Sequence, residues 1–99
     1  MCQPGWMSDI EVTKNEAASR YEARLDGQLA GYAQYRRHDD LIVFPHTVTD
    51  PAFEGRGVAS AIARVSLDEA RDAGLRVRPD CSFYAGWIAR HPDYQHLLA

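Results

Sequence analysis

The sequence has little cysteine, no long apolar run and no block of basic residues. Its two cysteines, Cys2 and Cys81, lie far apart. Such a pair is a poor disulfide framework, so we expect free thiols in a reducing, cytoplasmic compartment. No stretch approaches the roughly 20 apolar residues of a membrane span, and the N-terminus lacks the pattern of a signal peptide. The net charge of -3 argues against binding to nucleic acid or to an anionic membrane.

The composition is that of a globular protein. Hydrophobic residues make up 45% of the 99 residues and charged residues 25%, a balance typical of a folded chain rather than a disordered one. A chain of this length can bury one modest core, so we expect a single domain over residues 1–99, as a monomer or weak dimer. Residues 1–8 contain turn formers without a periodic pattern, and we expect them to form a flexible leader.

Alternating apolar and polar residues predict strands in the first half of the chain. The alternation runs over residues 18–25, and Asp26-Gly27 then predicts a tight hairpin turn. Further strands are expected over residues 28–37 and 41–49, joined by a turn at residues 38–40, and residues 10–13 are a candidate for a short first strand. The strand over residues 28–37 is expected to present one face made of Leu29, Gly31, Ala33 and Tyr35.

The hydrophobic period changes to that of a helix over residues 58–73. Gly74 suits the position just after a helix, where a positive φ is common. A strand over residues 75–78 and a second helix over residues 83–91 follow, with a last turn after Pro92. This order predicts an α+β fold with one strand–helix–strand crossover in a mostly antiparallel sheet. The expected buried face of the first helix consists of Ala59, Ile62, Ala63, Ser66, Leu67, Ala70 and Ala73.

Gly55 and Gly57 lie at the corner between the third long strand and the first helix. Backbone N–H groups at a helix start lack intrahelical partners and carry partial positive charge, and glycine allows a phosphate to approach them closely. The plain alternative is a turn that reverses the chain into the helix. Because a Walker lysine and the third glycine of the dinucleotide fingerprint are both missing, the pattern favours a different nucleotide.

Two side chains near this corner are candidates for chemistry. Pro45 interrupts the third long strand and predicts an edge or a bulge, beside which His46 is a candidate general base or a solvent-facing residue. Cys81 is a candidate nucleophile, because the following helix start and Arg78 would lower the pKa of its thiol. Its alternative is a small buried hydrophobic residue.

Several motifs together resemble the GCN5-related N-acetyltransferases, and in particular a compact subfamily of them. Residues 54–59 (EGRGVA) are similar to the acetyl-CoA loop Gln/Arg-x-x-Gly-x-Gly/Ala, with Glu54 in place of Gln or Arg. The other motifs are Phe44-x-His46-Thr47, Val77-x-Pro79-x-Cys81-x-Phe83 and Arg90-His91-Pro92-x-Tyr94-x-x-Leu97. The resemblance covers residues 18–98.

The resemblance implies an acetyl-CoA-dependent N-acetyltransferase acting on an amine of a small molecule or peptide, without a metal. It implies that the strands on either side of the first helix splay apart to hold the pantetheine arm of CoA. The alternative is a domain that binds CoA or a protein with little catalytic activity. The implied catalytic residues are Cys81 and His46, and the implied cofactor-binding residues are Glu54, Gly55, Arg56, Gly57, Val58, Ala59, Thr47, Val48 and His91. Arg64 and Arg90 are weaker candidates for phosphate contacts, and Tyr84, Trp87 and Tyr94 are candidates either for a ligand wall or for the core.

Overall fold

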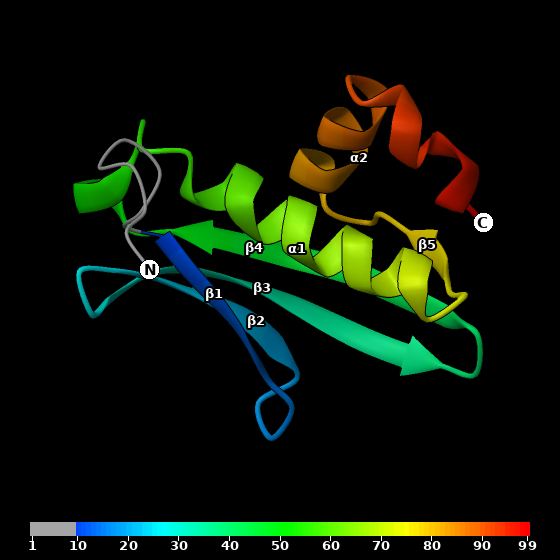
Figure 1. Cartoon of the computed structure of the whole chain (residues 1–99), viewed down its shortest axis with the longest axis horizontal. Coiled ribbons are helices and arrows are strands. Elements are labelled where there is room, and N and C mark those ends of the chain that lie inside the picture. Colours follow the sequence, from blue (N-terminus) through cyan, green and yellow to red (C-terminus); the bar gives the residue numbers. More distant parts are fainter. Residues whose placement is uncertain (1–9) are drawn as a thin grey trace.

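A five-stranded sheet is the framework of the structure, a computed structural model that describes residues 10–99 (Figure 1). The strands are β1 (Ile10–Asn15), β2 (Arg20–Leu25), β3 (Gln28–His38), β4 (Leu41–Thr49) and β5 (Arg76–Arg78). The first four are antiparallel neighbours in chain order, and β5 runs parallel to β4. The leader expected over residues 1–8, which includes Cys2, lies outside the described residues.

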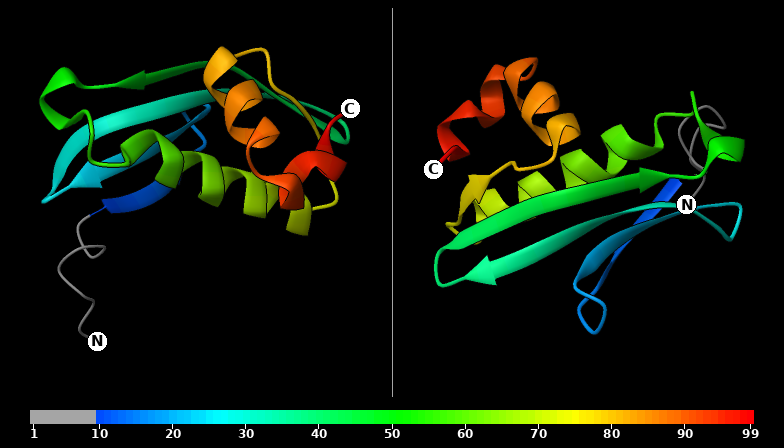
Figure 2. Two further views of the ribbon diagram at one scale, coloured as in Figure 1. Left: turned by 90° about the horizontal axis from the view of Figure 1, so that it is seen from above. Right: turned by 180° about the vertical axis from the view of Figure 1, so that it is seen from behind.

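Two α-helices and two short 3-10 helices complete the fold: η1 (Pro51–Phe53), α1 (Val58–Asp72), α2 (Ser82–Ala89) and η2 (Pro92–Leu97). α1 lies across one face of the sheet and contacts all five strands. α2 packs against α1 and η2 on the β5 side of the molecule (Figure 2). No helix of the described residues covers the other side of the sheet, which we call the open face. The arrangement confirms the expected α+β fold, with β4–α1–β5 as its crossover.

The core lies between the sheet and the helices. Its largest fully buried side chains are Trp87, Tyr21, Tyr84, Phe44, Ile42, Ile62 and Leu67. Burying one large apolar side chain stabilises a fold by about 1.5 to 3 kcal/mol, so these residues determine how α1 and α2 sit on the sheet. The expected buried face of the helix is correct from Ile62 to Ala70. Ala73 is exposed instead, because α1 ends at Asp72 and Ala73 is its cap.

A bulge reverses the expected face of Leu29. Ala30 is an extra residue of β3 in its register with β2. Ala30 is fully buried, and Leu29 is 39% exposed. Gly31, Ala33 and Tyr35 are buried as expected, but the prediction that Leu29 shares their face was wrong, because strict alternation does not continue through a bulge.

A second bulge lies at Pro45. Gln34 of β3 pairs with His46, whereas Arg36 pairs with Val43, so β4 contains one extra residue between these pairs. Proline suits this position because it has no N–H to contribute to the ladder. The bulge expected at Pro45 is therefore confirmed.

The remaining differences from expectation are at element ends. The first strand extends to Asn15, and the first hairpin turn has positive φ at Asp26 (52°) and Gly27 (81°), as a tight turn of this type requires. The second helix ends at Ala89 rather than at residue 91, because Arg90 caps it and η2 begins at Pro92. A helix tends to end before the residue that precedes a proline.

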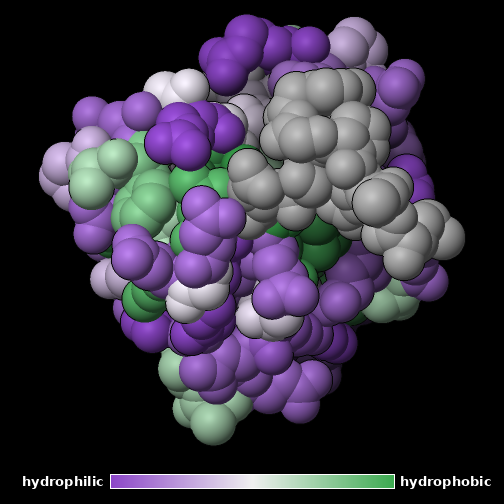
Figure 3. Space-filling view, turned by 60° about the vertical axis from the view of Figure 1, so that its left-hand side comes forward, coloured by the Kyte–Doolittle hydropathy of each residue, from purple (hydrophilic) through white to green (hydrophobic). Residues whose placement is uncertain are grey.

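The surface is mostly hydrophilic on the face that Figure 3 shows, with a patch of hydrophobic residues between hydrophilic ones. Over the described chain, the large hydrophobic residues with the greatest exposure are Leu29, Val65 and Leu98. None of the helices in residues 10–99 is long and apolar enough to cross a membrane.

Candidate active site

The gap between β4 and β5 is the centre of the candidate site. The two strands pair only from Leu41 to Val43 on the β4 side. Just beyond this pairing, the N–H of Cys81 donates to the carbonyl oxygen of Phe44 at 2.8 Å, and the chain turns into α2. The Cys81 thiol also donates to the Thr47 hydroxyl, with an Sγ–Oγ1 distance of 3.4 Å. The strands therefore splay apart, and Cys81 and Thr47 face each other across the splay.

The Cys81 sulfur lies among hydrogen-bond donors. Cys81 occupies the N-cap position of α2 and is half-buried. Burial raises the pKa of its thiol. Once the thiol is deprotonated, however, the Thr47 hydroxyl and the backbone N–H groups of Tyr84, Phe83 and Thr47 donate to the thiolate, and these hydrogen bonds outweigh burial and lower that pKa below its usual value. The thiolate is the nucleophilic form of cysteine. The surroundings thus favour a reactive sulfur over an inert one.

Arg78, which was expected to lower the pKa of the Cys81 thiol, forms an ion pair with another residue. Arg78 pairs with Asp80, with an Nε–Oδ1 distance of 2.9 Å, and both side chains are exposed. The lower pKa of the Cys81 thiol comes from uncharged donors, as described above. A nearby arginine is therefore not its cause.

Residues 54–57 connect η1 to α1 through two glycines in the left-handed conformation. Gly55 has φ 81° and Gly57 has φ 77°, a conformation that costs other residues roughly 1 to 2 kcal/mol. A Cβ at either position would meet no atom within 4 Å, so conformation rather than crowding requires glycine. The Gly57 carbonyl accepts from the N–H of Ala61 at 3.0 Å, and the N–H groups before Ala61 have no partner within the helix. An anion can approach these N–H groups directly.

A third glycine, Gly31, allows the start of α1 to pack closely against the sheet, because it has no side chain. A Cβ on Gly31 would lie 2.7 Å from the Val48 carbonyl oxygen and 3.1 Å from Cγ1 of Val58. Val58, the first residue of α1, is consequently buried to 2% exposure. This contact places the glycine loop at the end of β4, whereas Cys81 lies beside the β4 bulge.

The α2 side of the site is rigid and aromatic. The His91 ring stacks on Trp87 with centroids 3.7 Å apart, and its Nδ1 lies 2.6 Å from the Trp87 carbonyl oxygen. Because that oxygen only accepts, Nδ1 carries the hydrogen of this bond. The Arg64 guanidinium lies 5.5 Å from the centroid of the Trp87 ring. Tyr84, Trp87 and Tyr94 are buried and belong to the core.

The structure does not bring His46 to Cys81. His46 pairs with Gln34, and Gln34 lies on β3 between the buried residues Ala33 and Tyr35. Because side chains alternate along a strand, Gln34 and its partner His46 project from the open face, and both are exposed. The expected role of His46 as a general base stays a prediction, and the structure places this side chain on the opposite face of β4 from Thr47, the partner of Cys81.

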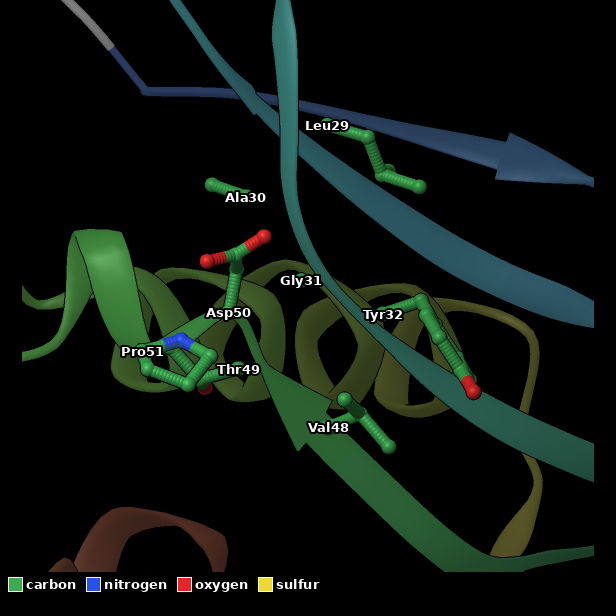
Figure 4. A pocket seen from close by; sticks show the side chains of 8 residues that line it. All are labelled: Leu29, Ala30, Gly31, Tyr32, Val48, Thr49, Asp50 and Pro51. Atoms are coloured by element: carbon green, nitrogen blue, oxygen red, sulfur yellow. The ribbon is translucent and has the colours of Figure 1, made fainter.

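Two hollows lie near the sheet, and neither is lined by Cys81 or by residues 54–59. The first, of about 230 Å³, lies between the ends of β3 and β4 (Figure 4). It is lined by Leu29, Ala30, Gly31, Tyr32, Val48, Thr49, Asp50 and Pro51. Val48, which the resemblance placed among the cofactor-binding residues, thus lines this hollow and pairs with Tyr32. The second hollow, of about 280 Å³, lies beside Pro45.

Two acidic residues of α1 accept hydrogen bonds from tyrosines of the core. The Tyr94 hydroxyl donates to Asp68 and the Tyr21 hydroxyl to Glu69, both at 2.5 Å. Lys14 also pairs with Glu69 at 2.9 Å. The partners in the two hydroxyl hydrogen bonds are 26 and 48 residues apart along the chain, so no local pattern could have revealed them.

Among residues 10–99 there is no group of three His, Cys, Asp or Glu residues that could hold a metal ion.

Solved structures share this fold. A protein from Staphylococcus aureus described as GCN5-like has a TM-score of 0.71 and 22% identity, covering 94% of this chain and 91% of that one. Ard1 from Thermoplasma volcanium has a TM-score of 0.56 and 21% identity, covering 62% of this chain and 43% of its own. Rv2747 from Mycobacterium tuberculosis, solved in complex with CoA, has a TM-score of 0.62 and 28% identity, covering 88% of this chain and 58% of its own. No curated protein matches the sequence.

A family comparison covers most of the described chain. The family described as GCN5-related N-acetyl-transferase matches residues 20–97. The match begins at the first residue of β2 and ends at the last residue of η2, so it includes the splayed strands, the glycine loop and Cys81. The chain therefore belongs to the GCN5-related N-acetyltransferase family.

Proposed function

We propose that the chain transfers an acetyl group from acetyl-CoA to an amine, and that the gap between β4 and β5 is where it does so. One observation carries this proposal: the strands separate after three paired positions, and the gap has a glycine-rich helix start at the end of β4 and a cysteine thiol beside the β4 bulge. Anion-binding groups and a polarisable sulfur thus border one gap. The complex of Rv2747 with CoA supports the choice of co-substrate.

In this proposal the glycine loop binds the pyrophosphate of CoA. Gly55 and Gly57 allow the N–H groups around the start of α1 to converge on one anion. Arg56, between them, is exposed and can add charge-assisted hydrogen bonds. The loop residues assigned to the pyrophosphate are Glu54, Gly55, Arg56, Gly57, Val58 and Ala59.

The pantetheine arm would run along β4 toward the bulge. Thr47 and the backbone of Val48 would contact it, and His91 would border the gap from the α2 side. A backbone N–H near the bulge would polarise the thioester carbonyl, which requires no particular side chain.

Cys81 would act at the reacting end of the cofactor by one of two routes. In the covalent route, its thiolate attacks the thioester carbonyl, a new sulfur–carbon bond forms, and the CoA thiolate leaves and takes up a proton. The neutral amine then attacks the acetyl-cysteine, the bond from the Cys81 sulfur to the acetyl carbon breaks and the thiolate is released. The amine nitrogen gives up one proton to water as the amide forms, which balances the proton taken up by CoA. In the direct route, the amine attacks acetyl-CoA itself and Cys81 lies beside the departing sulfur. The lowered pKa of the Cys81 thiol favours the covalent route.

His46 is not assigned to proton transfer in this scheme. It projects from the open face, whereas Thr47, the partner of Cys81, lies opposite the buried residue Ala33. An amine acceptor would therefore need to arrive neutral or lose its proton to water or to its own surroundings. Such an enzyme should become faster with rising pH until the free amine predominates.

A second candidate function is a CoA-binding or interaction domain with little catalysis. The observation that favours it is that neither of the two hollows described above is lined by Cys81. Turnover of acetyl-CoA with a panel of small-molecule and peptide amines separates the two functions.

Calorimetric titration with acetyl-CoA, CoA and ATP tests the binding half of the proposal. The test variant is G55A/G57A, and the matched control is G27A/G74A, because Gly27 and Gly74 have similar φ values (81° and 74°) and equally open surroundings. We expect the CoA species to bind the wild type and the control, and to lose most of their affinity for the test variant. Equal affinity of both variants would mean that the glycines only form a turn.

We also infer that the protein works in a reducing, cytoplasmic compartment, as a monomer or weak dimer. A free Cys81 thiol is needed for the proposed chemistry, and oxidation would block it. β1 and the unpaired part of β4 are the sheet edges through which a weak dimer would form. Light scattering over a range of concentrations measures the oligomeric state.

A further inference from the structure

The hollow beside Pro45 has the features of a binding site for a small anion. Its volume is about 280 Å³, close to the lower end of the range for ligand pockets, which starts at about 300 Å³. The lining residues are Ala18, Ser19, Gln34, Tyr35, Arg36 and Pro45. They come from the β1–β2 turn, from the middle of β3 and from the β4 bulge, so three segments meet there.

The polar side chains of this hollow project from the open face. Gln34 and Arg36 flank the buried residue Tyr35 along β3, so alternation places both on the side away from α1. The register adds two basic residues beside them, since Gln34 pairs with Arg20 of β2 and with His46 of β4. The hollow is thus bordered by hydrogen-bond donors and by basic side chains.

Arg36 is the cation available to a ligand. Arg20 is already engaged, because its guanidinium donates to Glu22 at 2.7 Å and lies 4.5 Å from the centroid of the Tyr32 ring. Arg36 forms no ion pair with any acidic side chain in residues 10–99. The adjoining β1–β2 turn contains one acidic residue, Glu16, which is exposed. A guanidinium that has no ion pair within residues 10–99 and lies beside a hollow suits a carboxylate, which it can bind through two parallel hydrogen bonds.

This hollow adjoins the reacting centre through the β4 bulge. Pro45 lines the hollow, and the preceding residue, Phe44, accepts the hydrogen bond from the N–H of Cys81 at 2.8 Å. β4 has no strand neighbour on the Cys81 side after Val43. The backbone of β4 at its bulge therefore lies between Arg36 on β3 and Cys81.

We propose that the hollow binds the carboxylate of the acetyl acceptor, so that the acceptor is a small molecule carrying both an amine and a carboxylate, such as an amino acid. This inference rests on the proposed acetyltransferase function for its use, but the carboxylate site can be tested without any turnover. Arg36 would hold the carboxylate, Gln34 and Ser19 would donate further hydrogen bonds, and the amine would extend past Pro45.

The adjacent arginine provides a matched control. Arg37 pairs with the buried residue Ile42, so it lies on the other face of β3, where its guanidinium donates to the Asp39 carbonyl oxygen at 3.1 Å. The variants R36Q and R37Q therefore remove the same charge one residue apart, on opposite faces of the sheet. Unchanged thermal unfolding of both variants would show that the fold is intact.

Binding is measured by titrating isotope-labelled protein with alanine, alaninamide and inorganic phosphate, following the backbone amide signals by NMR. We expect alanine to shift the signals of residues 19, 34 and 36, alaninamide to shift them far less, and R36Q to weaken alanine binding roughly 10- to 100-fold while R37Q does not. Equal responses to alanine and alaninamide, or equal behaviour of the two variants, would overturn the proposal. Binding of phosphate alone would assign the hollow to phosphate and also overturn it.

Acetylation assays distinguish this proposal from the proposed function. We expect R36Q to raise KM for an amino acid acceptor without changing kcat, and to leave the affinity for acetyl-CoA unchanged. If no amine is acetylated but alanine binding still depends on Arg36, the acetyltransferase function fails and the carboxylate site stands. If amines are acetylated without regard to a carboxylate, the site fails and the function stands.

Discussion

The thiol of Cys81 and the hydroxyl of Thr47 lie 3.4 Å apart across the gap where β4 and β5 separate. The two residues are 34 positions apart in the sequence, and they meet because the β4 bulge and the N-cap of α2 face the same gap. This pair gives the candidate active site its chemical character, since Thr47 supplies both a hydroxyl and a backbone N–H that favour the thiolate.

Thr47→Val should raise the pKa of the Cys81 thiol, because valine keeps the shape of threonine and removes the hydroxyl that stabilises the thiolate. The pH dependence of Cys81 alkylation measures this pKa, with Cys2 replaced by serine in all variants. Thr49→Val is the control, since Thr49 lies two residues further along the same strand and does not contact the thiol. Identical alkylation profiles for the two variants would show that the Thr47 hydroxyl has no such effect.

Cys81→Ala should abolish turnover if the acetyl group passes through the sulfur, and should leave much of it if transfer is direct. Mixing wild-type protein with acetyl-CoA alone should give a mass increase of one acetyl group, mapped to Cys81 by peptide mass spectrometry. A fully active Cys81→Ala variant that still binds acetyl-CoA would exclude the covalent route. Cys81→Ser gives a further comparison, since a serine hydroxyl is a far weaker nucleophile at neutral pH.

Gly31→Ala should destabilise the protein by about 1 to 3 kcal/mol and weaken CoA binding. The new methyl group would lie 2.7 Å from the Val48 carbonyl oxygen, so β4 or the start of α1 must move. Gly86→Ala, in α2, is the control: its methyl group would lie 3.4 Å from a flexible Arg90 side chain, and alanine favours a helix by up to about 1 kcal/mol. Chemical denaturation of both variants measures the difference, and a Gly31→Ala variant as stable as wild type would contradict the close contact.

The protein should lose stability in acid because Glu22 becomes protonated there. Hydrogen bonds from Arg20, Asn15 and Arg24 lower the pKa of this carboxyl to about 2, although its burial opposes the shift. Because the folded pKa lies below the unfolded one, the contribution is complete above about pH 5 and is lost as the pH falls toward 2. The side chain is 7% exposed, but arginine stems cover it at the sheet surface, where solvent still screens charge. We therefore expect a contribution of about 1 to 3 kcal/mol at neutral pH.

The free energy of unfolding of wild type, Glu22→Gln and Glu11→Gln as a function of pH tests this. Glu22→Gln should be less stable than wild type at pH 7 and should approach it below pH 3. Glu11 lies on the same face of the neighbouring strand and is exposed, which makes Glu11→Gln the control. If wild type and Glu22→Gln lose stability in parallel as the pH falls, the assigned role of Glu22 is wrong.

Local patterns sufficed for most of the fold. The alternation around Tyr21 and the helical period around Ile62 both place apolar residues on the core side, because side-chain direction depends on local backbone geometry alone. The bulge at Pro45 could also be predicted from a local property, since a residue without an N–H cannot complete the hydrogen bonds of a regular strand pair. The bulge at Ala30 has no such local marker, and with it the face of Leu29 could not be predicted.

In the candidate site, too, some features follow from local sequence patterns and others do not. The glycine loop was predictable because positive φ is a property of single residues, and Gly55 and Gly57 both adopt it. Which residues face Cys81 was not predictable, because a one-residue shift at the bulge decides that Thr47, and not His46, lies on its side of the sheet. The buried hydrogen bond between the hydroxyls of Ser66 and Tyr84, 2.8 Å long, was not predictable either, because the two residues are 18 positions apart.

The sequence by itself determined the element types, the crossover, the glycine loop and the presence of a cysteine at the start of the second helix. Each depends on interactions within a few residues along the chain. Only the tertiary structure decided that Cys81 meets Thr47 and that Arg36 borders a hollow beside Pro45. These relationships depend on strand register and on packing between distant segments, and a single bulge residue is enough to change them.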